Sequence, residues 1–160
     1  MSRSVFSIRP GDFSDPRVIA LLKYHFEKNH SVTPEGSAHV LDLAAIQVPE
    51  IAFFTLWDGD DLLGMGALRD FGDGSGEIKS MRTMDHALRR GVAAAMLEHL
   101  VADARGKGMK RLYLETGSFA YFDPARNLYA RFGFIECPPF QGYALDPNST
   151  YMTLALSPKP

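Results

Sequence analysis

The sequence predicts an α/β protein with a mixed (α+β) sheet of six to seven largely antiparallel strands and four helices. Three observations support this prediction. Short segments rich in β-branched and aromatic residues alternate apolar and polar side chains, whereas longer segments repeat apolar residues at helical spacing. Clusters of glycine, proline and aspartate separate these segments. In the second half of the chain, a strand–helix–strand unit favours one parallel strand pair, because its connection can cross over the sheet.

Length and composition predict one globular domain over residues 1–160. A chain of 160 residues with 46% hydrophobic and 22% charged residues can bury an ordinary core. The net charge of −2 argues against a nucleic-acid partner. The single cysteine, Cys137, excludes an internal disulfide and fits a reducing compartment. Because no signal peptide or transmembrane run is found, we expect a cytoplasmic protein with no membrane partner.

The first part of the chain predicts one strand and two helices. Residues 5–9 form the expected strand. Ser14-Asp15-Pro16 is typical of a helix start, and the apolar stripe behind it predicts a helix to about residue 28. Thr33-Pro34-Glu35 is a second capping signal, which opens a weaker helical segment to about residue 46.

Residues 51–84 predict an antiparallel meander of three strands. The expected strands are residues 51–57, 62–68 and 77–84, and the turns between them are rich in aspartate and glycine. Strict alternation along the third strand assigns one face to Ile78, Ser80, Arg82 and Met84.

The stretch that follows the third strand predicts an anion site. The strand pattern breaks at Asp85, and an apolar helical pattern then runs to about Arg105. Free N–H groups and the positive end of a helix meet at such a turn, and small residues leave room for a phosphate group. Neither the dinucleotide fingerprint nor the Walker A pattern is present. The residues expected to face the anion are Arg89, Arg90, Gly91, Val92, Ala93 and Ala94.

The remaining elements complete a β-α-α-β-β-β-α-β-α-β-β order. Residues 111–117 predict a strand, residues 123–132 a helix that Gly133 ends, and residues 134–137 and 151–156 the last two strands.

Two motifs resemble those of the GNAT superfamily of N-acetyltransferases. Leu88-Arg89-Arg90-Gly91-Val92-Ala93 is similar to the acyl-CoA loop Gln/Arg-x-x-Gly-x-Gly/Ala, with Leu88 as the departure. Ala125-Arg-Asn-Leu-Tyr129-Ala-Arg-Phe-Gly133-Phe134 is similar to a second family block, and the order of elements agrees with the family. Glu115-Thr116-Gly117 and Asp146-Pro147-Asn148-Ser149 resemble a branch of small bacterial acetyltransferases.

The resemblance implies direct transfer of an acetyl group from acetyl-CoA to a primary amine in a ternary complex, without a metal. Such a reaction needs a base for the ammonium group and an acid for the thiolate. Glu77 matches a base position in part of the family, and Glu115 is the reserve candidate. Tyr129 is the candidate acid. The alternatives are that Glu77 is an exposed hairpin-end carboxylate, Glu115 a solvated strand residue and Tyr129 a core residue.

The family also implies where the substrates bind. The main chain of Met81, Arg82 and Thr83 is expected to hold the acyl and pantetheine groups, and the turn at residues 89–94 the phosphates. The first two helices are expected to form a wall of the acceptor cleft, with substrate contacts from His30, Ser37, His39 and Asp42. Phe122 stands where the family usually has an asparagine.

The acceptor is predicted to be a small-molecule amine, because no charged docking run indicates a macromolecule. The family implies a possible homodimer. Two alternatives remain open: a non-catalytic acyl-CoA sensor or interaction module on the same fold, and an acetyltransferase acting on a protein N-terminus or lysine. The five histidines show no metal-ligand spacing, so no metal is expected.

Overall fold

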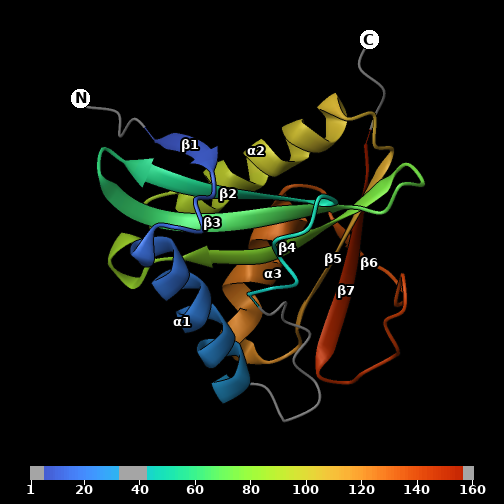
Figure 1. The fold of residues 1–160 in the computed structure, drawn as a ribbon. Coiled ribbons are helices and arrows are strands. Elements are labelled where there is room, and N and C mark those ends of the chain that lie inside the picture. The colour runs from blue at the N-terminus through green and yellow to red at the C-terminus, as the bar shows by residue number, and fades with distance from the viewer. Residues whose placement is uncertain (1–5, 33–42, 157–160) are drawn as a thin grey trace.

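The computed structural model describes residues 6–32 and 43–156, with the backbone alone for residues 29–32. A seven-stranded sheet with the order β1-β2-β3-β4-β5-β7-β6 forms its centre (Figure 1). The strands are β1 (Ser7–Pro10), β2 (Ile51–Asp58), β3 (Asp61–Asp70), β4 (Ser75–Thr83), β5 (Arg111–Gly117), β6 (Ile135–Glu136) and β7 (Ser149–Ala155). The helices are α1 (Pro16–Val32), α2 (Val92–Gly106) and α3 (Asp123–Arg131), with 3-10 turns η1 (Asp85–Ala87) and η2 (Ala120–Phe122).

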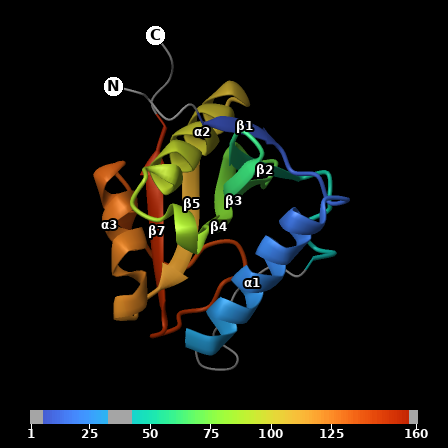
Figure 2. The ribbon, with the colours of Figure 1, turned by 90° about the vertical axis from the view of Figure 1, so that its left-hand side faces the viewer.

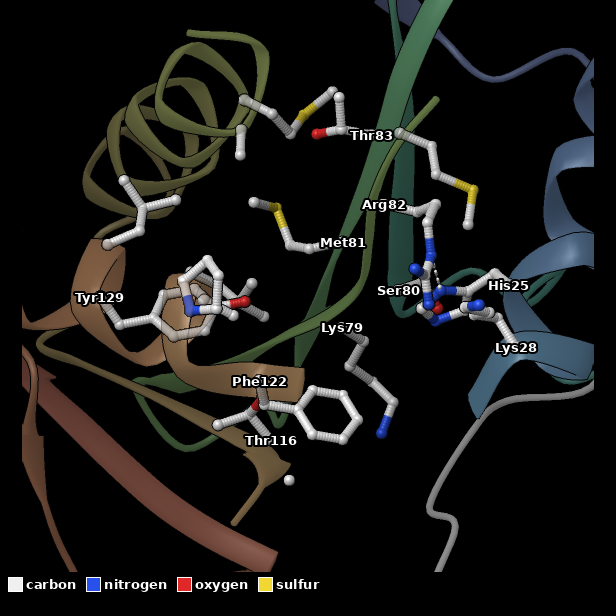
Figure 3. Close-up of a pocket in the computed structure, with 18 of the residues that line it drawn as sticks. His25, Lys28, Lys79, Ser80, Met81, Arg82, Thr83, Thr116, Phe122 and Tyr129 are labelled. Atoms are coloured by element: carbon white, nitrogen blue, oxygen red, sulfur yellow. Dashed lines mark hydrogen bonds between the residues drawn. The ribbon is translucent and has the colours of Figure 1, made fainter. Parts of the chain in front are cut away.

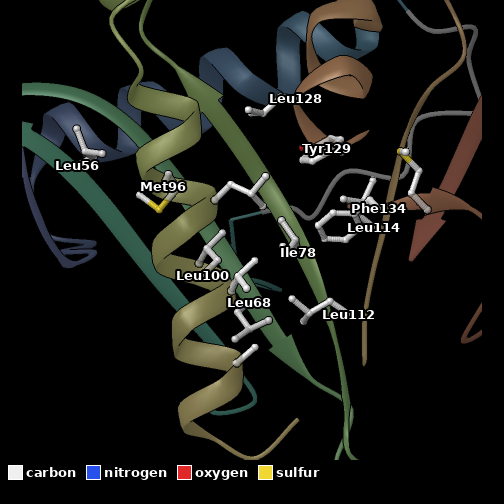
Figure 4. Packing of buried hydrophobic residues seen from close by; sticks show 14 of the residues in the cluster. Leu56, Leu68, Ile78, Met96, Leu100, Leu112, Leu114, Leu128, Tyr129 and Phe134 are labelled. Carbon is white, nitrogen blue, oxygen red and sulfur yellow. The ribbon is translucent and has the colours of Figure 1, made fainter. Parts of the chain in front are cut away.

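The helices cover both faces of the sheet (Figure 2). On one face, α2 and α3 pack against the sheet through a large apolar cluster that includes Ile78, Met96 and Leu114 (Figure 4). On the other face, α1 buries Val18 and Leu22 in a second cluster with residues of β2 and β3. The predicted apolar stripe of each helix is therefore the face that meets the sheet.

The parallel pair that the sequence predicts is confirmed, and it is short. β4 and β5 pair from Ser75 with Arg111 to Ile78 with Leu114, and every other strand pair is antiparallel among the described residues. Beyond Ile78 the two strands diverge, while β4 stays paired with β3 as far as Thr83. The centre of the sheet consequently opens between the ends of β4 and β5.

Strict alternation along β4 proves wrong after Lys79. Ser80 has a positive φ of 54°, and the register with β3 shifts between Met65 and Ala67. This bulge adds one residue and reverses the faces beyond it. Met81 therefore packs with Ile78 against the α2 cluster, whereas Arg82 reaches α1 on the opposite face.

The other differences concern element ends and one helix. The first helix, α1, continues to Val32, beyond the predicted end near residue 28. Of the predicted helix at residues 33–46, residues 33–42 lie outside the described part of the chain, and residues 43–46 form turns. The described residues thus contain three α-helices, against four predicted. The short β6 spans only Ile135–Glu136.

Candidate functional site

A cavity of about 530 Å³ lies where β4 and β5 diverge (Figure 3). The second half of β4, the end of β5, the first turn of α2, the middle of α1, η2 and α3 all contribute to its wall. Within the described residues, the main chain of Arg82 and Thr83 pairs with β3 on one side and with no strand on the other. An extended group entering the cavity can use these backbone donors and acceptors as an added strand would.

The first turn of α2 directs positive potential at this cavity. Gly91 precedes the helix with φ 82°, a left-handed conformation that favours glycine, and no side chain caps the helix start. The first N–H groups of the helix are therefore available to an anion. Val92 and Ala93 line the cavity, and their small or aliphatic side chains leave its mouth accessible.

Only some residues of the predicted phosphate turn line the cavity. Leu88 lines the cavity and is 56% exposed. Arg89 and Arg90 are exposed outside the lining, and Arg90 donates to Asp58 at 3.0 Å. Ala94 also lies outside the lining and is half-buried. Both arginines lie in the chain directly before the uncapped helix start, on the solvent side.

Glu77 is buried, so the alternative of an exposed hairpin-end carboxylate is wrong. Its side chain accepts hydrogen bonds from Lys79 Nζ at 3.1 Å and from the Tyr143 hydroxyl at 2.7 Å. Lys79 Nζ also lies 3.0 Å from the Tyr143 oxygen, which closes a three-membered polar cluster. Burial next to Glu77 raises the pKa of Tyr143 far above its usual range. The carboxylate of Glu77 is thus paired with a partly buried ammonium group.

Glu115 lines the same cavity from β5 and has a different environment. Among the described residues, its hydrogen bond is the one donated by Ser149 Oγ at 2.8 Å. Burial raises the pKa of Glu115 to about 7, and the nearby charge of Glu77 adds to the rise. The hydrogen bond from Ser149 and the charge of Lys79 act in the opposite direction. Near neutral pH this carboxyl group can therefore both accept and release a proton.

Tyr129 belongs to the core and to the cavity at once. It is 7% exposed, its ring lies edge-on to Phe134 at 5.9 Å between centroids, and it lines the cavity from α3. Burial raises the pKa of its phenol to about 12, with Glu115 adding to the rise and Arg82 opposing it. The hydroxyl group is consequently protonated at neutral pH and can donate a hydrogen bond into the cavity.

One wall of the cavity is formed by polar side chains of α1 that the sequence analysis did not name. Tyr24, His25 and Lys28 of this helix line the cavity, and Tyr121 of η2 joins them. Arg82 Nε donates to His25 Nδ1 at 3.0 Å (Figure 3), and Arg82 Nη1 donates to the Tyr121 hydroxyl at 3.0 Å. The spacing of Tyr24 and Lys28, four residues apart on a helix with a separate apolar stripe, was the signal available in the sequence.

The predicted acceptor residues lie mostly beyond the described structure. His30 lies in α1, and its side chain is not among those described. Ser37, His39 and Asp42 fall outside the described residues. Phe122 does line the cavity, with its ring so close to Gly117 that a Cβ atom there would lie 2.1 Å from Phe122 Cδ2.

The described residues contain neither a metal-binding cluster nor a membrane-spanning helix. No group of three or more histidine, cysteine, aspartate or glutamate side chains could hold a metal ion there. None of the described helices is long and apolar enough to cross a membrane.

The sequence is similar to known acetyltransferases. A profile of the acetyltransferase (GNAT) family matches residues 14–134. The chain belongs to this family. It is 45% identical over 149 residues to the uncharacterized N-acetyltransferase YsnE of Bacillus subtilis (strain 168), which covers 93% of this chain and 99% of YsnE. The protein is therefore an N-acetyltransferase with acetyl-CoA as its co-substrate, as the sequence predicts.

Solved acyltransferase structures confirm the predicted fold class. A Klebsiella pneumoniae protein described as an acyl-CoA N-acyltransferase has a TM-score of 0.81 and 25% identity, covering 97% of this chain and 100% of its own. A Bacillus subtilis acetyltransferase, solved in complex with CoA, has a TM-score of 0.71 and 16% identity, covering 96% and 100%. Because the Bacillus subtilis structure is only 16% identical in sequence, its similarity to this chain shows a shared fold alone.

Proposed function

We propose that this GNAT enzyme transfers the acetyl group of acetyl-CoA directly to a primary amine of a small molecule, with both substrates bound in the cavity between β4 and β5. The observation that carries the proposal is the convergence of three features on one space. These are the unpaired edge of β4, the uncapped start of α2, and a carboxyl group and a phenol facing the same cavity.

The residues present fit acetyl-CoA. The main chain of Met81, Arg82 and Thr83, on the side of β4 that faces no strand, would hold its amide-containing arm. The N–H groups at the start of α2 would hold its pyrophosphate. Arg89 and Arg90 would add charge at the solvent side. When bound, acetyl-CoA supplies a thioester whose carbonyl carbon is open to attack by an amine.

Glu115 is the better-supported base of the two candidate carboxylates. An unperturbed alkylamine has a pKa of about 10.4, so only roughly one molecule in a thousand is neutral at pH 7.4, a handicap of about 4 kcal/mol. Glu115, whose pKa lies at about 7, can accept the ammonium proton under these conditions. Glu77 already shares its charge with Lys79 and Tyr143, so we assign it the role of fixing the β4 wall.

Tyr129 supplies the proton for the leaving group in this proposal. The amine nitrogen bonds to the carbonyl carbon, the carbon–sulfur bond breaks, and the thiolate receives a proton from the phenol. Glu115 takes the ammonium proton and later releases it to solvent, and the second nitrogen proton returns through solvent to Tyr129, which restores the phenol. Cys137 is not part of the cavity wall, which favours direct transfer over a cysteine-bound intermediate.

Calorimetric titration with acetyl-CoA and with CoA is the first test, using the wild-type chain and Gly91→Glu. No atom lies within 4 Å of an added Cβ at position 91, so a carboxylate there would place negative charge at the mouth without a packing clash, and the positive φ adds backbone strain. We expect micromolar binding by the wild type and at least about a tenfold loss in the variant. Equal binding by both would overturn the assignment of the phosphate turn.

A thiol-release assay with acetyl-CoA and a panel of small amines then tests catalysis. Acetylation of at least one small amine, abolished by heat denaturation, is the expected result. Binding of acetyl-CoA without turnover of any small amine, but with acetylation of peptide N-termini or lysines, would overturn the small-molecule assignment.

A further inference from the structure

We propose that Ser149 is a positioning residue for Glu115, because it holds one oxygen of the carboxylate and leaves the other oxygen for the amine. This role rests on the proposed function, in which Glu115 is the base. It adds to the site a residue that lies outside the cavity wall. The contacts between β5 and β7 next to the cavity support it.

Strand register brings Ser149 beside Glu115. In the antiparallel pair of β5 and β7, Glu115 lies opposite Tyr151 and Gly117 lies opposite Ser149. Side chains two positions apart on a strand share a face, so Ser149 is a diagonal neighbour of Glu115 on the same side of the sheet. Ser149 Oγ donates to Glu115 Oε2 at 2.8 Å, a normal distance for a hydroxyl and a carboxylate. The contact is therefore a consequence of how the two strands pair.

The turn before β7 fixes the main chain of Ser149. The Ser149 N–H donates to the Asp146 carbonyl at 3.0 Å, and the Asn148 N–H donates to Asp146 Oδ1 at 2.9 Å. Ser118, directly after β5, donates its N–H to the Asn148 carbonyl at 3.1 Å and its Oγ to the Pro147 carbonyl at 2.7 Å. These bonds attach the turn to the end of the strand that carries Glu115, so the serine hydroxyl is held on an ordered backbone.

The single proton of the Ser149 hydroxyl is donated to Glu115. A serine hydroxyl has one proton to donate and can accept at its lone pairs. The Tyr151 phenol is also a hydrogen-bond neighbour of Ser149, but Tyr151 donates its own proton to the Ala144 carbonyl at 2.8 Å. An ionised carboxylate is a stronger acceptor than a neutral phenol, so the serine proton points to Glu115 when that group is charged.

The second carboxylate oxygen of Glu115 is left for the substrate. Oε1 has no hydrogen bond or ion pair with any residue in the part of the chain that the structure describes, and Glu115 lines the cavity. A bond to Oε2 limits rotation of the carboxyl group, so less orientational freedom is lost when Oε1 meets the ammonium group. A base positioned in this way can take the proton as soon as the amine is bound.

The same hydrogen bond acts on the titration of Glu115. Burial raises the pKa of this carboxyl group to about 7, and the bond from Ser149 is the largest influence in the opposite direction. A hydrogen bond donated to the charged form favours that form, so removing the serine hydroxyl raises the pKa further. The other titratable groups that interact with Glu115 are Glu77 and Lys79 of β4, Asp146 of the turn before β7, and the phenols of Tyr129, Tyr143 and Tyr151.

Removing the hydroxyl of Ser149 tests its role. Ser149→Ala should move the rising limb of kcat/KM against pH upward by about one pH unit and lower kcat at pH 7 by about tenfold. The KM for acetyl-CoA should stay within a few-fold of wild type, because Ser149 is outside the cavity wall. Ser149→Thr keeps the hydroxyl on a strand-compatible residue and should restore both values.

Thr150→Val is the matched control. Thr150 is the neighbouring residue on the other face of β7, is half-buried and lies outside the cavity wall. Its substitution also removes a hydroxyl group from the strand, and it should leave the pH profile and kcat unchanged. Melting temperatures compare the folding of the variants. The same pH limb and kcat in Ser149→Ala as in Thr150→Val would overturn the proposed role.

A double variant separates this role from the proposed function. If Ser149 acts through Glu115, Ser149→Ala should have little further effect on kcat in the Glu115→Gln background. An equal loss in both backgrounds would overturn the positioning role. If Glu115→Gln itself leaves kcat and the pH limb unchanged, the base assignment of the proposed function fails. If Glu115→Gln removes the limb and Ser149→Ala does not move it, only the role of Ser149 fails.

Carbon-13 NMR of glutamate-labelled protein measures the same contact without an acceptor amine. Glu115→Gln identifies the carboxyl resonance. Its titration midpoint should lie near pH 7 in the wild type, higher in Ser149→Ala, and at the wild-type value in Thr150→Val. An unchanged midpoint in Ser149→Ala would overturn the role of Ser149, whether or not any amine is turned over.

Discussion

At the scale of single residues, the two carboxyl groups in the cavity differ in what surrounds them. Glu77 has a partly buried ammonium partner and a phenol donor, whereas Glu115 has one hydroxyl donor and a negative neighbour. The same side-chain chemistry thus gives one structural carboxylate and one that titrates near neutrality. Local environment, rather than position at the end of a strand, separates the two roles.

The titration of Glu115 predicts the pH dependence of catalysis. A base must be deprotonated, so kcat/KM for acetyl-CoA-dependent acetylation should rise with pH and level off above about 7, where Glu115 has lost its proton. Glu115→Gln should lower kcat by about 10²- to 10⁴-fold and remove this limb of the profile. The measurement is kcat/KM from pH 5.5 to 9. A profile with the same limb in Glu115→Gln would assign the titration to another group.

Replacing Tyr129 by phenylalanine separates its two roles. The ring remains to pack against Phe134, so the melting temperature should change little, while kcat should fall by about 10²-fold or more because the thiolate loses its donor. The KM for acetyl-CoA should stay within a few-fold of wild type. A large loss of thermal stability with a normal kcat would instead make Tyr129 a core residue only.

At the scale of elements, the bulge in β4 organises the site. One extra residue at Ser80 places Met81 in the α2 cluster and Arg82 on the α1 side, which strict alternation does not allow. Opposite the bulge, β3 carries Gly66, where the α2 side chains approach closely. The bulge and this glycine therefore let α2 pack tightly beside the cavity.

Enlarging Gly66 tests this close packing. A Cβ atom there would lie 2.7 Å from Met96 Cγ, 3.0 Å from Leu100 Cδ1 and 3.1 Å from Met81 Sδ. Gly66→Val should lower the free energy of unfolding by about 1–3 kcal/mol through overpacking, measured by denaturant titration. Gly106→Ala, at a position with nothing within 4 Å, is the control and should be neutral or slightly stabilising. Equal effects of the two substitutions would contradict the packing argument.

At the scale of the whole molecule, the sheet divides the protein into two halves with different tasks. The face covered by α2 and α3 holds the larger apolar cluster and the start of α2. The face covered by α1 holds the polar wall with His25 and Lys28. The opening between β4 and β5 connects the two faces, so in the proposed reaction acetyl-CoA and the amine approach the same space from opposite sides.

Much of this architecture is predictable from local patterns. Strand β5 has the predicted bounds, α2 ends one residue from its predicted end, and the parallel pairing of β4 with β5 follows from the length of their connection. The turn before α2 is recognisable because its small residues are adjacent in the chain. These features depend on side-chain periodicity and on neighbours within a few positions, which the sequence displays directly.

The sequence by itself determined the order of the elements, the family motifs and the residues that can carry the chemistry. Only the tertiary structure decided what those residues contact. Tyr143 meets Glu77 across 66 positions of the chain, and Arg82 meets His25 across 57. Such contacts depend on strand register, on one bulge and on how deeply each carboxyl group is buried. None of these has a local sequence period, because each is fixed by packing between segments far apart in the chain.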